Sequence, residues 1–358
     1  MDFIRITKRS DLPRSKEIII TILAVAMSIV FAGIILAVFG LNPFEIFREI
    51  IMGSVGTEMR IKQTIVKAVP LIITSMGIIV AFKMKFWNIG AEGQITMGAL
   101  GAAWVAINLH GTLPQPALLL LMMAAAAICG GIWAFIPAVF KAKLGTNETI
   151  FTLMLNYVAI KFVTYLQYGP WRDPGAKGFP RIETFSQDAV LPSLGGVHTG
   201  WIIAVLATVF VYFFMKSTKL GYEIAVVGES IETARYAGMN ISKIIIAAML
   251  ISGGLCGITG MIQASAVEKT LVYGIANNYG FTAIITAWLS KLKAGYALLV
   301  CVAFAMLMQG GDYIQIAMGV SSTVSDIVQG LILFFILGSE FFLRYKVHLG
   351  RAVEKEVA

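Results

Sequence analysis

Charged residues are scarce in this chain. Aspartate, glutamate, lysine and arginine account for 13% of its 358 residues, whereas hydrophobic residues account for 58%. A soluble domain carries about 25% charged residues. The apolar residues gather in recurring runs of about twenty, the length at which an α-helix crosses a bilayer. The scarcity of charge excludes a soluble domain, and the runs predict an all-α polytopic membrane protein embedded in lipid.

Cysteine and histidine are also few, and neither occurs at a metal-binding spacing. The three cysteines (Cys129, Cys256 and Cys301) lie inside apolar runs, and the three histidines lie far apart. We expect the cysteines to be small core residues, with no metal site. The net charge of +8 is carried by segments that flank the apolar runs. It therefore indicates membrane orientation and not binding to nucleic acid.

Recognisable catalytic motifs are missing from the sequence as well. No G-x-x-x-x-G-K-[ST] stretch occurs, and the nearest one, Gly175-Ala176-Lys177, lacks both the spacing and the final hydroxyl residue. No serine–histidine–aspartate or cysteine–histidine arrangement is evident either. We therefore expect the chain not to be an enzyme and to bind no cofactor of its own.

Basic residues set the expected topology. Residues 1–17 are rich in lysine and arginine and lack a signal-peptide cleavage site, which predicts a cytoplasmic N-terminal tail. Residues 18–343 then form the membrane region, with about nine full spans and a short apolar segment at 279–289. Residues 169–199 form an external loop, residues 216–243 form a cytoplasmic loop, and the polar residues 310–315 form a turn. Residues 344–358 form a second cytoplasmic tail.

The cytoplasmic loop at 216–243 carries the signals of a short helix. Ser230 is suited to the N-cap, Glu232 falls in the first turn, Arg235 falls in the last turn and Gly238 is suited to the stop. The spacing predicts a helix of about two turns. A membrane chain without an energy-converting site needs such an element to dock a separate motor, although a solvated connecting loop would have the same spacing.

The stretch FWNIGAEGQ at 86–94 sets Asn88, Glu92 and Gln94 beside Gly90 and Gly93, between two apolar runs. Glycine releases the backbone from a regular helix and frees polar groups for a passing solute. Such a break is tolerated in a membrane only where protein or a water-filled cavity surrounds it. A cytoplasmic turn remains the alternative, because Lys83 and Lys85 precede the stretch.

The predicted fifth span, at about 149–168, has two polar faces. Helical spacing places Glu148, Thr149, Thr152 and Asn156 on one face. The adjoining face carries Tyr157, Lys161, Thr164, Tyr165 and Tyr168. A lysine near the centre of a span costs about 2.5–3.5 kcal/mol, so Lys161 should face protein or water, or reach toward the membrane surface. We expect a stripe that faces a solute pathway, with packing against a neighbouring subunit as the alternative.

Three stretches carry a resemblance to a known family. FWNIGAEGQITMGALGA, GTNETIFTLMLNYVA at 145–159 and GESIETARYAGMNISK at 228–243 resemble, in this order, the signatures of permease subunits of bacterial nucleoside ABC importers. These permeases belong to the larger group for branched-chain amino acids and simple sugars. The three matches are spread along the chain from residue 86 to residue 243, and together they are specific for the family. Trp87 departs from the family pattern.

The resemblance implies a type II-like importer fold in the bacterial plasma membrane. Separately, the expected topology of five spans up to Tyr168 and five after Thr199 predicts two halves of opposite orientation, a common plan for transport proteins. The resemblance implies three kinds of partner: ATPase subunits that bind the ATP, a second permease copy or paralogue, and an external solute-binding lipoprotein. It places Asn88, Gly90, Glu92, Gly93 and Gln94 near the pathway, followed by Asn147, Glu148 and Asn156. It places Ala234, Arg235, Tyr236, Ala237 and Gly238 in the loop that contacts the ATPase.

Two other functions remain as alternatives. A permease for ribose- or galactose-type sugars would belong to the same group. An ion-coupled secondary transporter would need acidic residues in the middle of its spans, whereas Glu148 and Asp326 lie near predicted ends. Nucleosides suit aromatic faces with nearby amide side chains, and the nucleoside importer is the function that we expect.

Overall fold

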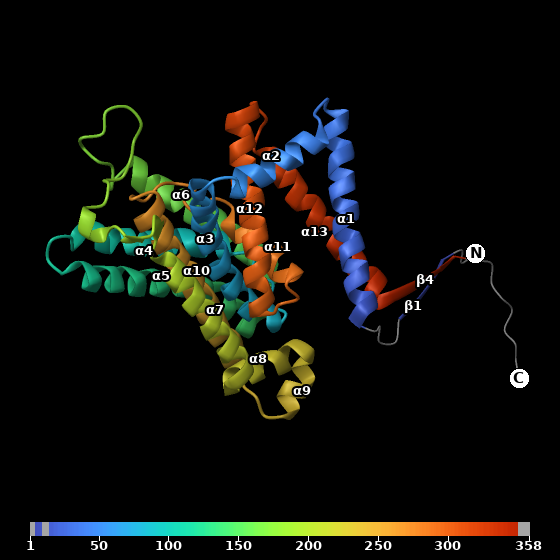
Figure 1. Ribbon diagram of the computed structural model, residues 1–358. Helices are drawn as coiled ribbons and strands as arrows, with labels where there is room; N and C mark the ends of the chain where they lie inside the picture. Colours follow the sequence, from blue (N-terminus) through green and yellow to red (C-terminus); the bar gives the residue numbers. More distant parts are fainter. Residues whose placement is uncertain (1–3, 9–13, 350–358) are drawn as a thin grey trace, which may run out of the picture. The chain divides into compact units, whose positions relative to one another are not determined.

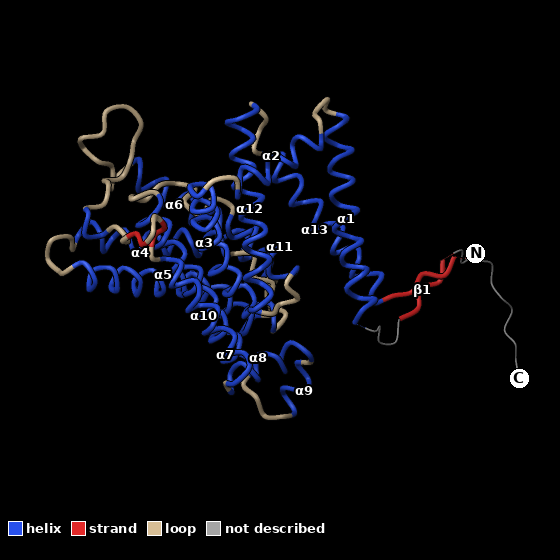
Figure 2. The backbone as a smooth tube through the Cα atoms, viewed as in Figure 1, coloured by secondary structure: helices blue, strands red, loops and turns tan. Residues whose placement is uncertain are grey.

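The computed structural model describes residues 4–8 and 14–349, and it is almost entirely helical (Figures 1 and 2). The chain divides into two compact units. The larger comprises residues 58–305, and the smaller combines residues 1–57 with residues 306–358. Helix α12 (Ala294–Met318) begins in the larger unit and ends in the smaller.

The larger unit contains most of the helices. In chain order they are α3 (Glu58–Lys83), α4 (Ala91–Asn108), α5 (Gln115–Leu144), α6 (Glu148–Tyr168), α7 (Gly200–Ser217), α8 (Lys219–Glu229), α9 (Ile231–Tyr236), α10 (Ile241–Ile262) and α11 (Tyr279–Leu289). A π-helical turn, Gln263–Val267, extends α10. The loop before α7 holds a 3₁₀ turn, Gln187–Ala189, and a short hairpin of β2 (Ser193–Leu194) and β3 (Val197–His198).

Glycine allows α4, α5 and α10 to pack closely at the centre of this unit. Gly257 of α10 lies against Gly98 of α4 and against the backbone of Ala126 in α5, and neither side has room for a Cβ atom. Gly260 lies equally close to the backbone of Ile95. Small residues let helix backbones approach within a membrane, where packing and not the hydrophobic effect holds helices together. These contacts fix the position of α4, which begins the candidate site.

The smaller unit is held by an apolar core. Its helices are α1 (Arg14–Val38), α2 (Pro43–Val55), the end of α12 and α13 (Thr323–Arg344). Leu36, Ile46, Ile50, Ile314 and Val324 form the buried cluster. The antiparallel strands β1 (Ile4–Lys8) and β4 (Tyr345–Leu349) pair in a register that sets Ile4 opposite Leu349. The sequence had placed β1 and β4 in the two cytoplasmic tails and had predicted no strand in either.

The predicted turn at residues 310–315 is wrong, because α12 continues through it to Met318. Gly310 packs against Ile50 and Gly311 packs against Ser325, and neither glycine has room for a side chain. The two glycines therefore serve close packing inside the helix. The chain turns later, at Gly319, whose φ of +65° is the left-handed conformation that favours glycine.

Six helices of the described part are long and apolar enough to cross a membrane, judged by length and composition, and the number is seven if α1 and α2 form one bent span. The bend between Ile22–Val38 and Pro43–Val55 is 116°. The count is below the nine to ten spans expected from the apolar runs. Helix α4 carries Glu92 and Gln94 inside the protein, and α11 has only 11 residues, as the sequence predicted.

Candidate functional site

The stretch between α3 and α4 is a break in the helical backbone, in which Met84, Phe86, Asn88 and Gly90 are buried whereas Lys85 and Trp87 are exposed. Asn88 and Gln94 join its two ends: the Asn88 amide donates to Oε1 of Gln94 at 3.1 Å, and the Gln94 amide donates to Oδ1 of Asn88 at 3.0 Å. The same Oδ1 accepts the backbone N–H of Gly90 at 3.0 Å. Both side chains are almost completely buried. The reciprocal bonds satisfy polar groups that would be costly to bury unpaired.

Helix α6 closes over this break from one side. Asn156 accepts the backbone N–H of Gly93 at 2.8 Å and donates to the carbonyl oxygen of Ile89 at 2.9 Å. The hydroxyl of Thr152, one turn earlier, accepts the backbone N–H of Ile89 at 3.2 Å. A Cβ atom at Gly90 would stand 3.0 Å from Cβ of Thr152. The glycine is therefore needed for close approach of α6.

Glu92 connects the break to a segment almost two hundred residues away. Its Oε1 accepts the backbone N–H of Asn278 and its Oε2 accepts that of Gly280, each at 2.9 Å. These two donors lie at the N-terminus of α11, where four N–H groups lack intrahelical partners and a carboxylate is favourably placed. Gly280 has no room for a Cβ against the backbone of Glu92. Glu92 thus acts as a cap supplied by another helix.

Asn147 and Glu148 begin α6. The Asn147 side chain accepts the N–H groups of Thr149 and Ile150, which is the geometry of an N-cap. Glu148 is largely buried and forms an ion pair of 2.7 Å with Lys141, near the end of α5. These two residues hold the α5–α6 corner and form no recorded hydrogen bond with the break at residues 84–90.

The structure therefore brings together seven of the nine residues that the sequence placed at the pathway: Asn88, Gly90, Glu92, Gly93, Gln94, Thr152 and Asn156. We call this set the polar clamp. Its members bond to or pack against α6, α10 and α11. Sequence reasoning missed Ser252 of α10, whose hydroxyl accepts from Asn88 at 3.2 Å, and the two amides before and within α11. No spacing in the sequence points to partners so distant along the chain.

The opposite side of α6 is exposed. Tyr157, Lys161, Phe162, Tyr165 and Tyr168 all present their side chains outside the larger unit. The two polar faces predicted for this helix are thus separated: Thr152 and Asn156 are buried in the clamp, whereas Tyr157, Lys161 and Tyr165 remain available to a partner or a solute. We call the five exposed residues, Tyr157, Lys161, Phe162, Tyr165 and Tyr168, the open face of α6.

The short helix predicted after Ser230 is confirmed as α9. The Ser230 hydroxyl accepts the N–H of Thr233 at 3.2 Å, and Gly238 beyond the helix has a φ of +73°. Ala234 is completely buried, while Glu232, Arg235 and Tyr236 are exposed, Tyr236 by 94%. Ala237 caps the C-terminus. The helix is anchored by one small residue and presents its charged and aromatic residues outward.

Helix α8 precedes α9, and the sequence did not indicate it. Thr218 caps α8 by accepting the N–H of Gly221 at 3.0 Å. Gly228, near its end, packs directly on the carbonyl of Lys83, the last residue of α3. Since the break with the polar clamp starts just after Lys83, α8 touches the segment that enters the clamp. Figure 1 shows α8 and α9 at the far end of α7 from the loop of residues 169–199.

Three aromatic residues also border the break. Trp87 stacks on Trp288 of α11 with ring centroids 5.4 Å apart and an interplanar angle of 26°, and both contact Phe82 of α3. Such offset pairs contribute about 0.5–1.5 kcal/mol beyond the area that they bury. Trp87, the departure from the family pattern, is therefore accommodated by an aromatic partner on α11.

The loop of residues 169–199 is tied to the α4–α5 turn. Asp188 accepts the N–H of Gly111 at 2.8 Å and a hydrogen bond from the Ser186 hydroxyl. These two donors, the hydroxyl first, hold the pKa of the Asp188 carboxyl below its usual value. Arg181 and Asp173 form an exposed ion pair of 3.3 Å in the same loop.

The long apolar helices of the described part are those of a multi-pass membrane protein. Residues 60–337 match the family described as "Branched-chain amino acid transport system / permease component", and the chain belongs to this family. It is therefore the permease subunit of an ABC importer and not an enzyme. Such a permease works with an ATPase and other transporter components.

Three relatives cover nearly the whole chain. A glucose ABC transporter permease protein of Haloferax volcanii is 35% identical over 91% of this chain and 88% of its own length. A guanosine ABC transporter permease protein of Bacillus subtilis is 29% identical over 91% of this chain and 94% of its own. A nucleoside ABC transporter permease protein of Lactococcus lactis is 25% identical over 96% of this chain and 97% of its own. The similarities fit both nucleoside and sugar transport.

Proposed function

We propose that this chain imports a nucleoside, with ATP hydrolysed on partner ATPase subunits and the solute delivered by an external binding lipoprotein. The observation that carries this proposal is the open face of α6. Tyr157, Tyr165 and Tyr168 offer aromatic rings to a base, and Lys161 between them donates to ring or hydroxyl oxygens. A second permease, identical or paralogous, would face this side and complete the path.

In this proposal the polar clamp acts on the path through the backbone. Asn88, Glu92, Gln94 and Asn156 join the α3–α4 break to α6 and α11. These four side chains are buried and use their polar groups in hydrogen bonds within the protein. In this proposal their role is therefore to position the open face and not to bind the solute themselves. That Asn88 and Glu92 lie near the solute pathway stays a prediction.

Energy would enter through α9. Arg235, Tyr236 and Glu232 project outward and are suited to a groove on an ATPase subunit, while the buried Ala234 transmits force to the permease. From α9 the movement would pass to α8, and from Gly228 of α8 to the end of α3. The break that holds the first residues of the clamp starts immediately after α3. The path is short and consists of packed backbone, which transmits displacement well.

The topology of the proposal places residues 216–243 and both termini in the cytoplasm and residues 169–199 outside. Support comes from the positive-inside rule and from the separation of α9 and the loop within the larger unit (Figure 1). Two single cysteine substitutions test it, Phe179→Cys and Tyr236→Cys, since these side chains are 91% and 94% exposed. A membrane-impermeant maleimide on intact cells should label position 179 alone, above the background of the unsubstituted chain. Labelling of position 236 from outside would overturn the topology and the coupling role.

A sugar is the second candidate solute, because a glucose permease is 35% identical to this chain. Uptake of radiolabelled guanosine and of radiolabelled glucose, measured in cells with and without the intact transporter, separates the two. We expect guanosine uptake that depends on the transporter and resists excess glucose. Transporter-dependent glucose uptake without guanosine uptake would replace the nucleoside by the sugar. Accumulation of either solute by the chain without its ATPase, driven by an ion gradient, would overturn the importer mechanism.

The open face is tested by Tyr165→Ala and Tyr157→Ala in the intact transporter. Loss of a stacking ring should lower guanosine uptake about tenfold, by analogy with the energy of aromatic stacking on a base. Val158→Ala, on the same helix and also exposed, is the matched control. Unchanged uptake in both tyrosine variants would remove the open face from the solute path.

A further inference from the structure

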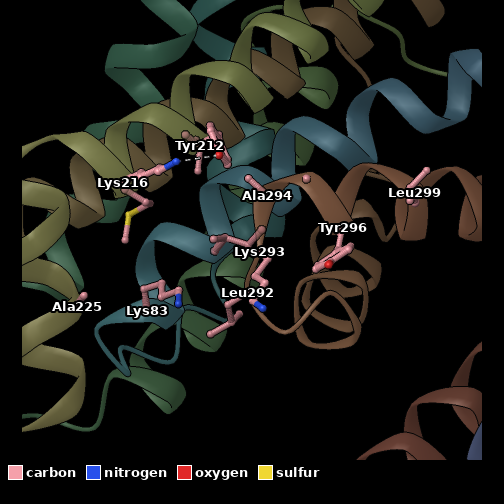
Figure 3. A pocket seen from close by; sticks show the side chains of 13 residues that line it. Lys83, Tyr212, Lys216, Ala225, Leu292, Lys293, Ala294, Tyr296 and Leu299 are labelled. Carbon is pink, nitrogen blue, oxygen red and sulfur yellow. Dashed lines mark hydrogen bonds between the residues drawn. The ribbon is translucent and has the colours of Figure 1, made fainter. Parts of the chain in front are cut away.

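A cavity of about 540 Å³ lies beside the end of α3, and none of its lining residues belongs to the polar clamp. Its wall comes from α3, α7, α8 and the start of α12 (Figure 3). Ile79, Val211, Met215 and Leu299 form an apolar surface. The volume falls in the range of about 300–1,000 Å³ that holds small-molecule ligands.

Three lysines surround this apolar surface. Lys83 is the last residue of α3, Lys216 lies in the last turn of α7 and Lys293 immediately precedes α12. Lys216 donates to the hydroxyl of Tyr212 at 3.3 Å, and Lys293 lies 5.6 Å from the ring centroid of Tyr296 (Figure 3). Lysine and tyrosine at helix ends are typical of the level at which a membrane helix meets the headgroups.

The positive charge of this cavity is not neutralised by the protein around it. None of the thirteen lining residues is acidic. Within the described residues, 4–8 and 14–349, no ion pair with a carboxylate is recorded for Lys83, Lys216 or Lys293. Each ammonium has three donors, and the one bond to Tyr212 leaves most of them available. The cavity therefore suits a molecule with an anionic group and an apolar body.

We propose that this cavity binds an anionic phospholipid, with its phosphate held by Lys83, Lys216 and Lys293 and its acyl chains lying along Ile79 and Leu299. The helices α3, α7 and α12, which form the apolar wall, each meet the criterion for a membrane span. Basic pockets between membrane helices recognise anionic headgroups by this combination of charge and apolar surface. A free phosphate would leave the apolar wall uncovered, which favours the lipid.

The site would bear on coupling, because Ala225 of α8 forms part of the wall. Gly228, one turn later in α8, packs on the carbonyl of Lys83, whose side chain lines the same cavity. A lipid held here therefore contacts both α8 and the end of α3, the two elements that pack together at Gly228. This inference does not depend on which solute the transporter carries.

The experiment is native mass spectrometry of the purified full-length chain, titrated with phosphatidylglycerol or with phosphatidylcholine of the same acyl chains. We expect phosphatidylglycerol to bind about tenfold more tightly to the unsubstituted protein. The triple variant Lys83→Gln, Lys216→Gln, Lys293→Gln should lose this preference. A triple variant with the same loss of charge at exposed lysines, Lys143→Gln, Lys177→Gln, Lys269→Gln, should keep it.

A second substitution leaves the charges in place. Leu299→Trp would fill the apolar wall from a position that is 66% exposed, and it should weaken phosphatidylglycerol binding while the protein stays folded. Thermal unfolding in detergent verifies the fold of each variant. Equal affinity for the two lipids, or a preference that survives both Leu299→Trp and the first triple variant, would overturn the proposal. Equal loss in the two triple variants would show general charge attraction and would also overturn it.

Discussion

The backbone amide of Gly280 donates a hydrogen bond of 2.9 Å to the carboxylate of Glu92, across 188 residues of sequence. Glu92 lies in the first turn of α4, and Gly280 lies in the first turn of α11. The starts of two helices that are distant along the chain are thereby joined by one side chain. The bond makes α11 depend on the same break that α6 covers, so a change at Glu92 should be felt in both helices.

The first prediction concerns this carboxylate. Glu92→Gln replaces one acceptor oxygen by an NH₂ group and leaves one backbone N–H of α11 unpaired, which should destabilise the protein by about 1–3 kcal/mol. Glu92→Leu leaves the N–H groups of both Asn278 and Gly280 unpaired. This variant should lose more stability than Glu92→Gln and should also impair uptake. Thermal unfolding in detergent measures the order of stability of these variants. Glu268→Gln, at an exposed carboxylate, is the control and should have little effect. Equal stability of the three variants would contradict the capping role.

The second prediction concerns Asn156, which bridges Ile89 of the break and Gly93 of α4. Asn156→Leu removes a donor and an acceptor at once and leaves two buried backbone groups without partners. We expect a loss of about 2–4 kcal/mol in stability and reduced uptake, with the ATPase still bound to the complex. Asn108→Leu, near the end of α4 and exposed, should leave both unchanged. Normal uptake by Asn156→Leu would mean that α6 is held by other contacts.

The third prediction concerns the packing of α8 on α3. No Cβ fits at Gly228 without displacing the carbonyl of Lys83. Gly228→Ala should therefore separate the two helices and lower transport while ATP hydrolysis continues, because the movement of α9 no longer reaches the clamp. Gly330→Ala is the control, since a Cβ there meets nothing within 4 Å. The ratio of solute imported to ATP hydrolysed, in reconstituted transporter, is the measurement. An unchanged ratio in Gly228→Ala would contradict this path.

The fourth prediction concerns α9 itself. The double variant Arg235→Glu, Gly238→Val reverses an exposed charge and places a branched residue at a φ of +73°. A left-handed conformation costs a residue with a Cβ about 1–2 kcal/mol. We expect insertion into the membrane to be retained and uptake to be abolished, with the ATPase no longer copurifying. Arg172→Glu, in the loop of residues 169–199, should retain the ATPase. Uptake at the normal rate by the double variant would count against docking at α9.

Local signals predicted local structure well. The capping residues around Ser230 predicted α9. The 11 residues of α11 coincide with the short apolar segment predicted at 279–289. Capping and apolar run length depend on neighbours within a few positions, so a sequence contains them. The same reasoning failed at residues 310–315, where polar residues beside two glycines indicated a turn. Only the contacts of Gly310 and Gly311 with Ile50 and Ser325 explain why the helix continues.

The orientation of α6 shows a second limit. Helical spacing separated its two polar faces, but both were compatible with a solute path. The structure buries Thr152 and Asn156 against the α3–α4 break and leaves Tyr157 and Tyr165 exposed. Burial depends on the partners that a face meets, and these partners come from other helices. The proposal of inverted halves remains a prediction from topology.

The sequence by itself indicated that this protein lies in a membrane and that it resembles permeases. It also indicated that residues 86–94 combine glycines with polar side chains and that residues 228–243 carry the capping signals of a short helix. Composition suffices for the first conclusion and short-range spacing for the last, whereas the second rests on the resemblance of three stretches to known permeases. The tertiary structure alone decided that Glu92 caps α11, that Asn88 meets Ser252, and that Gly228 lies on the end of α3. Each of these contacts joins segments that are distant along the chain, and its existence depends on how whole helices pack.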